Sequence, residues 1–114
     1  MSEPTLAEQG WRMPAEWEPH AATWMSWPSR KDTSFPEGDH HDRVLPVFLE
    51  MIRAITSSER LYLNCTDPAD RAYVEANLDA ETKRNLVITD IPAVYPWCRD
   101  HGAIFIVNDE LGQV

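Results

Sequence analysis

The sequence has few basic residues for its length. Ten lysines and arginines stand against nineteen aspartates and glutamates, so the formal net charge is −9 at pH 7. A surface that binds phosphate needs a basic patch, and the shortage of positive charge therefore argues against a nucleic-acid partner. An acidic chain is compatible with a small cationic substrate, although much of such charge is a solvated surface that keeps a protein soluble.

Long hydrophobic runs and glycine are also scarce. No apolar run approaches the roughly 20 residues that span a bilayer, and the N-terminus lacks the basic and apolar parts of a signal peptide. Four glycines form no phosphate-binding loop, and the two cysteines, Cys65 and Cys98, have no recognised spacing. We therefore expect a cytoplasmic protein in a reducing compartment, without a membrane partner.

What the sequence does contain is an alternation of strand and helix signals. Its 114 residues amount to one domain or less. Asp42 is expected to be the N-cap of the first helix, and Asp67 with Pro68 is a typical start of the second. The pattern predicts an α/β fold with a small mixed sheet and two helices. The predicted strands cover residues 21–28, 60–65, 85–89 and 103–107, and the predicted helices cover residues 43–56 and 68–78.

The two ends of the chain carry weaker signals. Residues 1–12 are mostly polar and are predicted to form a flexible arm, whereas residues 13–114 form the folded part; residues 29–41 read as a loop. Residues 108–112 are typical of a hairpin turn. The second strand of that hairpin has barely begun at Val114, so we expect the folded part to be incomplete.

The run from Trp97 to Gly102 is the leading candidate for a functional site. A carboxylate such as that of Asp100 can hold a planar guanidinium through two parallel hydrogen bonds, and an indole such as that of Trp97 can offer a cation–π face. The alternative from spacing alone is that Asp100 pairs with Arg99 or caps the turn, while Trp97 belongs to the core.

Other residue clusters favour structural roles. Cys98 and His101 are interpreted as structural, as is Cys65, because reactivity needs a lowered pKa that sequence does not reveal. The run 39–42, Asp-His-His-Asp, is read as a solvated loop and helix cap instead of a metal site, since a third distant ligand is missing. The tryptophans at 17, 24 and 27 are expected in the core.

Two separated motifs resemble one family. Met13-Pro14-Ala15-Glu16-Trp17-Glu18-Pro19-His20, followed by Thr23-Trp24-Met25-Ser26-Trp27-Pro28, is similar to the opening of the agmatine deiminase and bacterial peptidyl-arginine deiminase family. Trp97-Cys98-Arg99-Asp100-His101-Gly102 resembles that family's W-x-R-D-x-G signature. The resemblance implies the first module, and the start of the second, of a pentein fold, which is a propeller of α/β modules.

The resemblance also implies a reaction. Family members hydrolyse a guanidinium to a ureido group with release of ammonia, converting agmatine to N-carbamoylputrescine or peptidyl-arginine to citrulline, without metal or organic cofactor. Asp100 matches the aspartate that binds the substrate, and Trp97 matches a residue that lines the pocket. The family's nucleophilic cysteine and its histidine lie far downstream, so neither Cys98 nor His101 is assigned a catalytic role.

The sequence is therefore compatible with two functions. The first is the N-terminal part of a guanidine-hydrolysing deiminase, with a small guanidinium compound as its substrate and no turnover by this chain alone. The second is a non-catalytic α/β module that acts in binding or self-association, because a single propeller module would expose apolar faces and strand edges.

Overall fold

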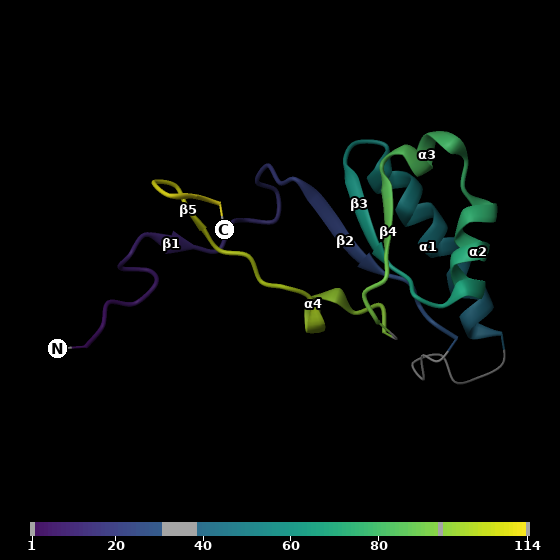
Figure 1. Cartoon of the computed structure of the whole chain (residues 1–114), viewed down its shortest axis with the longest axis horizontal. Coiled ribbons are helices and arrows are strands. Elements are labelled where there is room, and N and C mark those ends of the chain that lie inside the picture. Colours follow the sequence, from purple (N-terminus) through teal and green to yellow (C-terminus); the bar gives the residue numbers. More distant parts are fainter. Residues whose placement is uncertain (1, 31–38, 94, 114) are drawn as a thin grey trace. The chain divides into compact units, whose positions relative to one another are not determined.

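The computed structural model describes residues 2–30, 39–93 and 95–113, and it divides into two compact units (Figure 1). One unit consists of residues 20–100 and is called the sheet–helix unit below. The other combines residues 1–19 with residues 101–114 and is called the terminal unit. Val114 and most of the predicted 29–41 loop, namely residues 31–38, lie outside the described residues.

The sheet–helix unit is built on three parallel strands. Their order in the sheet is β2 (Ala22–Ser26), β3 (Arg60–Asn64) and β4 (Leu86–Thr89). The long helix α1 (His40–Thr56) connects the first two strands, and α2 (Pro68–Asn77) with the short helix α3 (Ala80–Arg84) connects the next two. The predicted strand–helix alternation is confirmed, but the prediction of two helices missed α3 and the single-turn helix α4 (Cys98–His101).

The strands alternate their side chains between two faces of this sheet. Trp24, Tyr62 and Val87 are partners in the strand register and therefore lie in one row across one face. Their neighbours Met25 and Leu63 point to the opposite face and are buried there. The first face is called the open face below, because Trp24 and Val87 remain 40% and 38% exposed.

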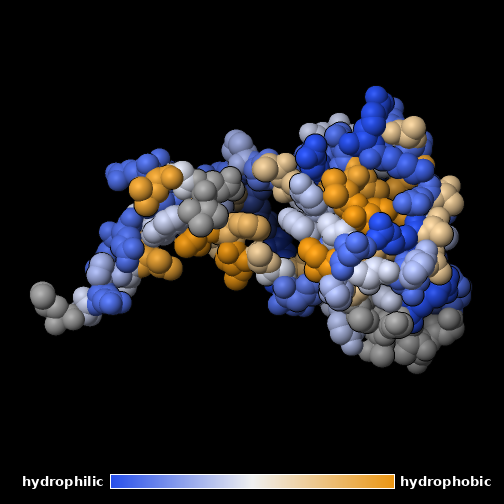
Figure 2. Space-filling model, viewed as in Figure 1, coloured by the Kyte–Doolittle hydropathy of each residue, from blue (hydrophilic) through white to orange (hydrophobic). Residues whose placement is uncertain are grey.

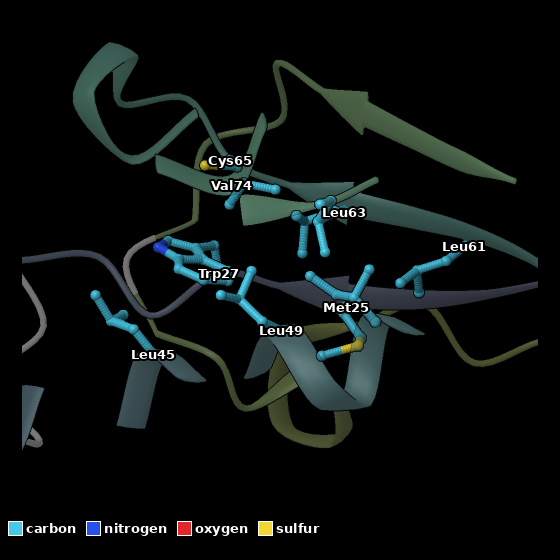
Figure 3. Close-up of a cluster of buried hydrophobic side chains, with 10 residues drawn as sticks. Met25, Trp27, Leu45, Leu49, Leu61, Leu63, Cys65 and Val74 are labelled. Atoms are coloured by element: carbon cyan, nitrogen blue, oxygen red, sulfur yellow. The ribbon is translucent and has the colours of Figure 1, made fainter. Parts of the chain in front are cut away.

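The hydrophobic core lies between the other face of the sheet and the helices. Figure 3 shows side chains from β2, β3 and the residues that directly follow these strands meeting those of α1 and α2. Its fully buried members have relative exposures of 0–1%, and fully burying one such side chain contributes about 1.5–3 kcal/mol. These members are Trp27, Ile52, Leu61, Leu63 and Val74.

The two main helices begin in different ways. The Asp67 carboxylate accepts hydrogen bonds from the backbone amides of Ala69 (2.9 Å) and Asp70 (3.2 Å), which confirms the predicted cap of α2. Helix α1 corrects the prediction, because it starts at His40 and has Asp39 at its N-cap. Asp42 lies in the first turn instead, where a carboxylate is favourable next to the positive end of the helix dipole.

The terminal unit contains a second, antiparallel sheet. Strand β5 (Val107–Asn108) pairs with β1 (Trp11–Arg12) on one side and with β6 (Gly112–Gln113) on the other. The predicted hairpin over 108–112 is confirmed. Gly112 has a φ of +86°, a conformation that glycine adopts readily and other residues do not.

Two polar clusters hold this small sheet together. Arg12 donates hydrogen bonds to the Asp109 carboxylate (3.1 and 3.3 Å) and to Glu18 (3.0 Å). The Asn108 side chain donates to the Gln9 carbonyl (3.0 Å) and accepts from two backbone amides of the hairpin. Asn108 is the one buried side chain among the described residues of this unit, which therefore has no hydrophobic core there.

Several predictions about strands are wrong. The strands form two separate sheets, one parallel and one antiparallel, instead of one mixed sheet. The apolar run 103–107 does not form a strand over its length: only Val107 is in β5, and Ile104 and Phe105 are 76% and 51% exposed. Within the predicted arm of residues 1–12, Trp11 and Arg12 form β1, while the flexibility of the arm stays a prediction.

The tryptophans are also only partly as predicted. Trp27 is in the core, but Trp24 lies on the open face, where its ring stacks on Tyr62 with centroids 4.7 Å apart. Trp17 is 88% exposed, in the terminal unit. Hydrophobic side chains reach the surface in both units (Figure 2). Within the described residues, no helix has the length and apolar character needed to cross a membrane.

Candidate functional site

The predicted site residues lie on and beside one short helix. Helix α4 (Cys98–His101) is a single turn that follows β4 and its loop. The Asp100 amide donates to the carbonyl of Trp97 (2.9 Å), so the two residues are three positions apart on one turn. Trp97 immediately precedes α4, so this bond places its indole and the Asp100 carboxylate at the two ends of one turn.

The Asp100 carboxylate is exposed and has no hydrogen bond or ion pair with any side chain that the structure describes. The alternative that Asp100 pairs with Arg99 is therefore not what the structure shows. Trp97 is half exposed and so does not belong to the core. A carboxylate left open beside an open indole is the arrangement that could receive a planar cation.

A row of polar side chains fastens α4 to the end of the parallel sheet. Thr89 donates to the Asn64 side-chain oxygen (2.7 Å), and the Asn64 side-chain nitrogen donates to the Ser26 hydroxyl (3.1 Å). The Cys98 thiol donates to the same hydroxyl (3.3 Å). Ser26, Asn64 and Thr89 are the last residues of their strands and are partners in register, so α4 contacts the carboxyl edge of the sheet. Binding sites of parallel α/β sheets commonly form at this edge.

Sequence reasoning missed this polar row, although a signal was present. Each of the three parallel strands ends on a polar residue after apolar ones, in the runs Trp-Met-Ser, Tyr-Leu-Asn and Val-Ile-Thr. The carboxyl ends of parallel strands meet at one edge, so these polar residues could have been placed together.

The structure places the other candidate residues as follows, and one placement differs from the prediction. Cys65 lies in the core, where burial, aided by the nearby Asp70 charge, raises the pKa of its thiol to about 12 and keeps it protonated. Cys98 is half-buried and hydrogen-bonded to Ser26, while His101 is exposed at the end of α4. The change concerns His40 and His41, which are helical instead of in a loop.

No group of three or more metal-ligating side chains gathers anywhere in the described part of the chain. His41 contacts the Pro28 carbonyl through Nε2 (2.8 Å), and Asp42 pairs with Arg30 (3.2 Å). A hollow of about 340 Å³ lies between α2, α3 and β4, but neither Asp100 nor Trp97 lines it. The candidate site is thus an open surface on α4.

His20, in the N-terminal motif, lies beside the amino ends of the parallel strands, opposite to the edge that contacts α4. His20 contacts the Glu59 carboxylate (2.5 Å), which also accepts a hydrogen bond from Thr23 (2.8 Å). Glu59 immediately precedes β3, and Thr23 is the second residue of β2. His20 therefore joins the starts of these strands, far along them from the ends that contact α4.

Comparison with known proteins decides the family. Residues 12–114 match the family described as Porphyromonas-type peptidyl-arginine deiminase. The chain belongs to this family. It is 34% identical over 112 residues to an agmatine deiminase of Pseudomonas aeruginosa, covering 96% of this chain and 28% of that protein. It is 35% identical over 104 residues to an agmatine deiminase of Ectopseudomonas mendocina, covering 91% and 26%.

The fold agrees with this membership of the peptidyl-arginine deiminase family. An agmatine deiminase structure from Enterococcus faecalis matches with a TM-score of 0.72 and 26% identity, over 96% of this chain and 28% of that one. The chain thus spans little more than a quarter of the length of these relatives. The family resemblance stated from the two motifs is confirmed.

Proposed function

We propose that this chain supplies one wall of the substrate site of a guanidine-hydrolysing deiminase. The observation that carries the proposal is the open Asp100 carboxylate beside Trp97, on a helix fixed to the carboxyl edge of a parallel sheet. A guanidinium offers a planar fork of donors that matches a carboxylate, and an indole face adds attraction for the same cation. Membership of a deiminase family supports this assignment.

The proposed reaction replaces one nitrogen of the guanidinium by oxygen. A cysteine thiolate attacks the guanidinium carbon, ammonia leaves, and water then hydrolyses the amidino–thioether intermediate to give the ureido product and the free thiol. Asp100 would hold the positive charge of the substrate in place throughout. Neither Cys65 nor Cys98 is assigned as the nucleophile, because one is a buried thiol with a raised pKa and the other donates to Ser26.

Agmatine is the preferred substrate of this proposal, with peptidyl-arginine as the other member of the same chemical class. Two agmatine deiminases are among the relatives above 30% identity, while the family description names peptidyl-arginine. The propeller arrangement, the independence from metal and organic cofactors and the cytoplasmic location belong to the same proposal.

Asp100→Asn tests the assigned role. Agmatine titrated into the 15N-labelled chain should shift the Trp97 indole and Asp100 amide signals. The substitution removes the charge and should weaken this binding roughly 10- to 100-fold, as expected for a charge-assisted hydrogen bond. Asp90→Asn is the matched control, because it removes the same charge from an exposed carboxylate that pairs with Arg71.

Two results would count against the proposal. Equal agmatine affinity of Asp100→Asn and the unsubstituted chain would remove the role of Asp100. Release of ammonia from agmatine by the 114-residue chain would show that a nucleophile is present in it, contrary to the assignment. An arginine-containing peptide that binds more tightly than agmatine would reverse the choice of substrate within the class.

The second candidate function, a module for self-association, is supported by a separate observation. The terminal unit exposes Leu6, Met13, Ile104 and Leu111 by 57–76%, and the open face of the parallel sheet exposes Trp24 and Val87. Contiguous exposed apolar side chains are typical of surfaces that meet another chain.

A further inference from the structure

Helix α4 is too short to hold its own shape. A single turn fixes several backbone torsions for very few hydrogen bonds, so isolated turns of this kind are unstable in water. Three of its four residues are exposed, and only Cys98 is half-buried. The geometry of the candidate site therefore depends on what α4 contacts.

Cys98 contacts the Ser26 hydroxyl, and this hydroxyl is itself held in place. Ser26 has a relative exposure of 0%, and its Oγ accepts from both the Asn64 amide (3.1 Å) and the Cys98 thiol (3.3 Å). Asn64, itself 8% exposed, is held from its other side by Thr89 (2.7 Å). A buried polar network in which each member has a partner is rigid and specifies one arrangement.

The polar side chains of Ser26, Asn64 and Thr89 indicate a role beyond packing. Serine, asparagine and threonine at the ends of three strands could be replaced by apolar residues that bury well, as their neighbours Met25 and Leu63 do. Instead they form a line of donors and acceptors that ends on α4, three residues before the helix ends and two before Asp100. Such a line transmits the position of the rigid sheet to the carboxylate.

We propose that Ser26 is a positioning residue which, through the Cys98 thiol, holds α4 so that Asp100 and Trp97 face the same guanidinium. Asn64 fixes the Ser26 hydroxyl and has the same role one step further away. The inference rests on the proposed function for the identity of the ligand, but the fixing of α4 by Ser26 stands on the hydrogen bonds alone.

Three variants of the 114-residue chain test this role. Cys98→Ala removes the donor and leaves the Ser26–Asn64 bond intact, so it is the variant least disruptive to folding. Cys98→Ser keeps an O–H donor at the same position and should behave like the unsubstituted chain. Ser26→Ala removes the acceptor. Ser57→Ala is the matched control, because its hydroxyl donates to the Ala54 carbonyl at the end of α1.

Two measurements are made on each variant. The first is the hydrogen-exchange rate of the Asp100 amide, which is bonded to the Trp97 carbonyl. The second is the affinity for agmatine from an NMR titration. Cys98→Ala and Ser26→Ala should speed exchange and weaken binding, each by roughly 3- to 10-fold, as expected for the loss of one hydrogen bond. Exchange in β3 should stay unchanged, which excludes global destabilisation.

The outcomes separate this inference from the proposed function. Unchanged exchange of the Asp100 amide in both Ala variants overturns the positioning role, as does failure of Cys98→Ser to behave like the unsubstituted chain. Faster exchange with unchanged agmatine affinity also overturns it, because α4 would then be held without consequence for the site. If exchange is faster in the two Ala variants but Asp100→Asn leaves agmatine affinity unchanged, the fixing of α4 is supported and the proposed function is overturned instead.

Discussion

Asp70 is an acidic residue that the fold buries, with a relative exposure of 4%. Burial raises the pKa of its carboxyl, and the neighbouring Asp67 charge raises it further, against smaller opposing effects of His41 and Arg30. The Trp27 indole N–H also lowers this pKa, although no hydrogen bond of standard length and angle joins the two groups. Asp70 therefore carries an electrostatic cost whenever it is ionised.

The raised pKa of Asp70 makes the stability of the fold depend on pH. A carboxyl whose pKa is raised in the folded state holds its proton more tightly there than in the unfolded chain. Its contribution to stability is fully present below the unfolded pKa and is lost as the pH rises through the folded pKa. Asp70→Asn cannot ionise, so its unfolding free energy should lack this loss.

Urea unfolding of both proteins from pH 3 to pH 7 measures the effect. The stability of the unsubstituted chain relative to Asp70→Asn should fall as the pH rises through the acidic range. Two curves that stay parallel across that range would show that Asp70 titrates in the folded protein as it does in the unfolded one.

Among the elements, the pairing of β1 with β5 depends most on charge. Arg12 lies between Glu18 and Asp109 and lowers the pKa of both carboxyls, and they in turn raise the pKa of its guanidinium. Carboxyls with lowered pKa values stabilise the folded form above their unfolded pKa values, and this stabilisation is lost as the pH falls through the folded ones. The antiparallel sheet should therefore open on acidification before the parallel sheet does.

NMR spectra recorded between pH 6 and pH 3 test this prediction. The backbone signals of Val107 and Asn108 should move toward random-coil positions at a higher pH than those of Leu61 and Leu63. A variant tests the role of the arginine directly. Arg12→Gln should leave the signals of β5 close to random-coil positions even at pH 6.

The control is Arg71→Gln, which removes an ion pair with Asp90 in the other unit and should not move the β5 signals. Persistence of the β1–β5 pairing in Arg12→Gln would contradict the assigned role.

Comparison of the elements shows how far local signals reach. Helix α2 was predicted correctly because Asp67 and Pro68 act on their own neighbours along the chain. The run 103–107 was predicted wrongly, since its apolar residues have strand character but most find no partner strand among the described residues. Strand pairing also depends on residues that are distant in the sequence, since Val107 pairs with Arg12 on one side and with Gln113 on the other.

The candidate site, too, was predictable from the sequence only in part. Asp100 and Trp97 could be singled out from their residue types and spacing, and the structure places them on one turn. That Asp100 has no partner among the described residues could not be predicted, because Arg99 is adjacent in sequence and pairing depends on side-chain direction. The link from Cys98 to Ser26 spans 72 residues, and only the folded sheet brings them together.

At the scale of the whole molecule, exposed apolar side chains compete with a net charge of −9. Apolar surface favours association of two copies, whereas like charge opposes it. Salt screens the repulsion, because the Debye length falls from about 30 Å at 0.01 M to about 8 Å at 0.15 M. The second candidate function therefore predicts self-association that strengthens with added salt.

Sedimentation velocity at several protein and salt concentrations tests this prediction. A sedimentation coefficient that rises with both concentrations would support self-association. Trp24→Ser, in the open face, and Leu111→Ser, in the terminal unit, would show which surface is responsible. A monomer under all conditions would contradict the second candidate function and leave the substrate-site proposal as the remaining one.

The pairing of β1 with β5 also sets an order of events during synthesis. Arg12 and its partner Asp109 are 97 residues apart, so at about 5–20 residues per second the first is made roughly 5–20 s before the second. All three parallel strands are translated within that interval. The strand β1 therefore leaves the ribosome without its partner and stays accessible to chaperones and proteases until Val107 and Asn108 have been synthesised.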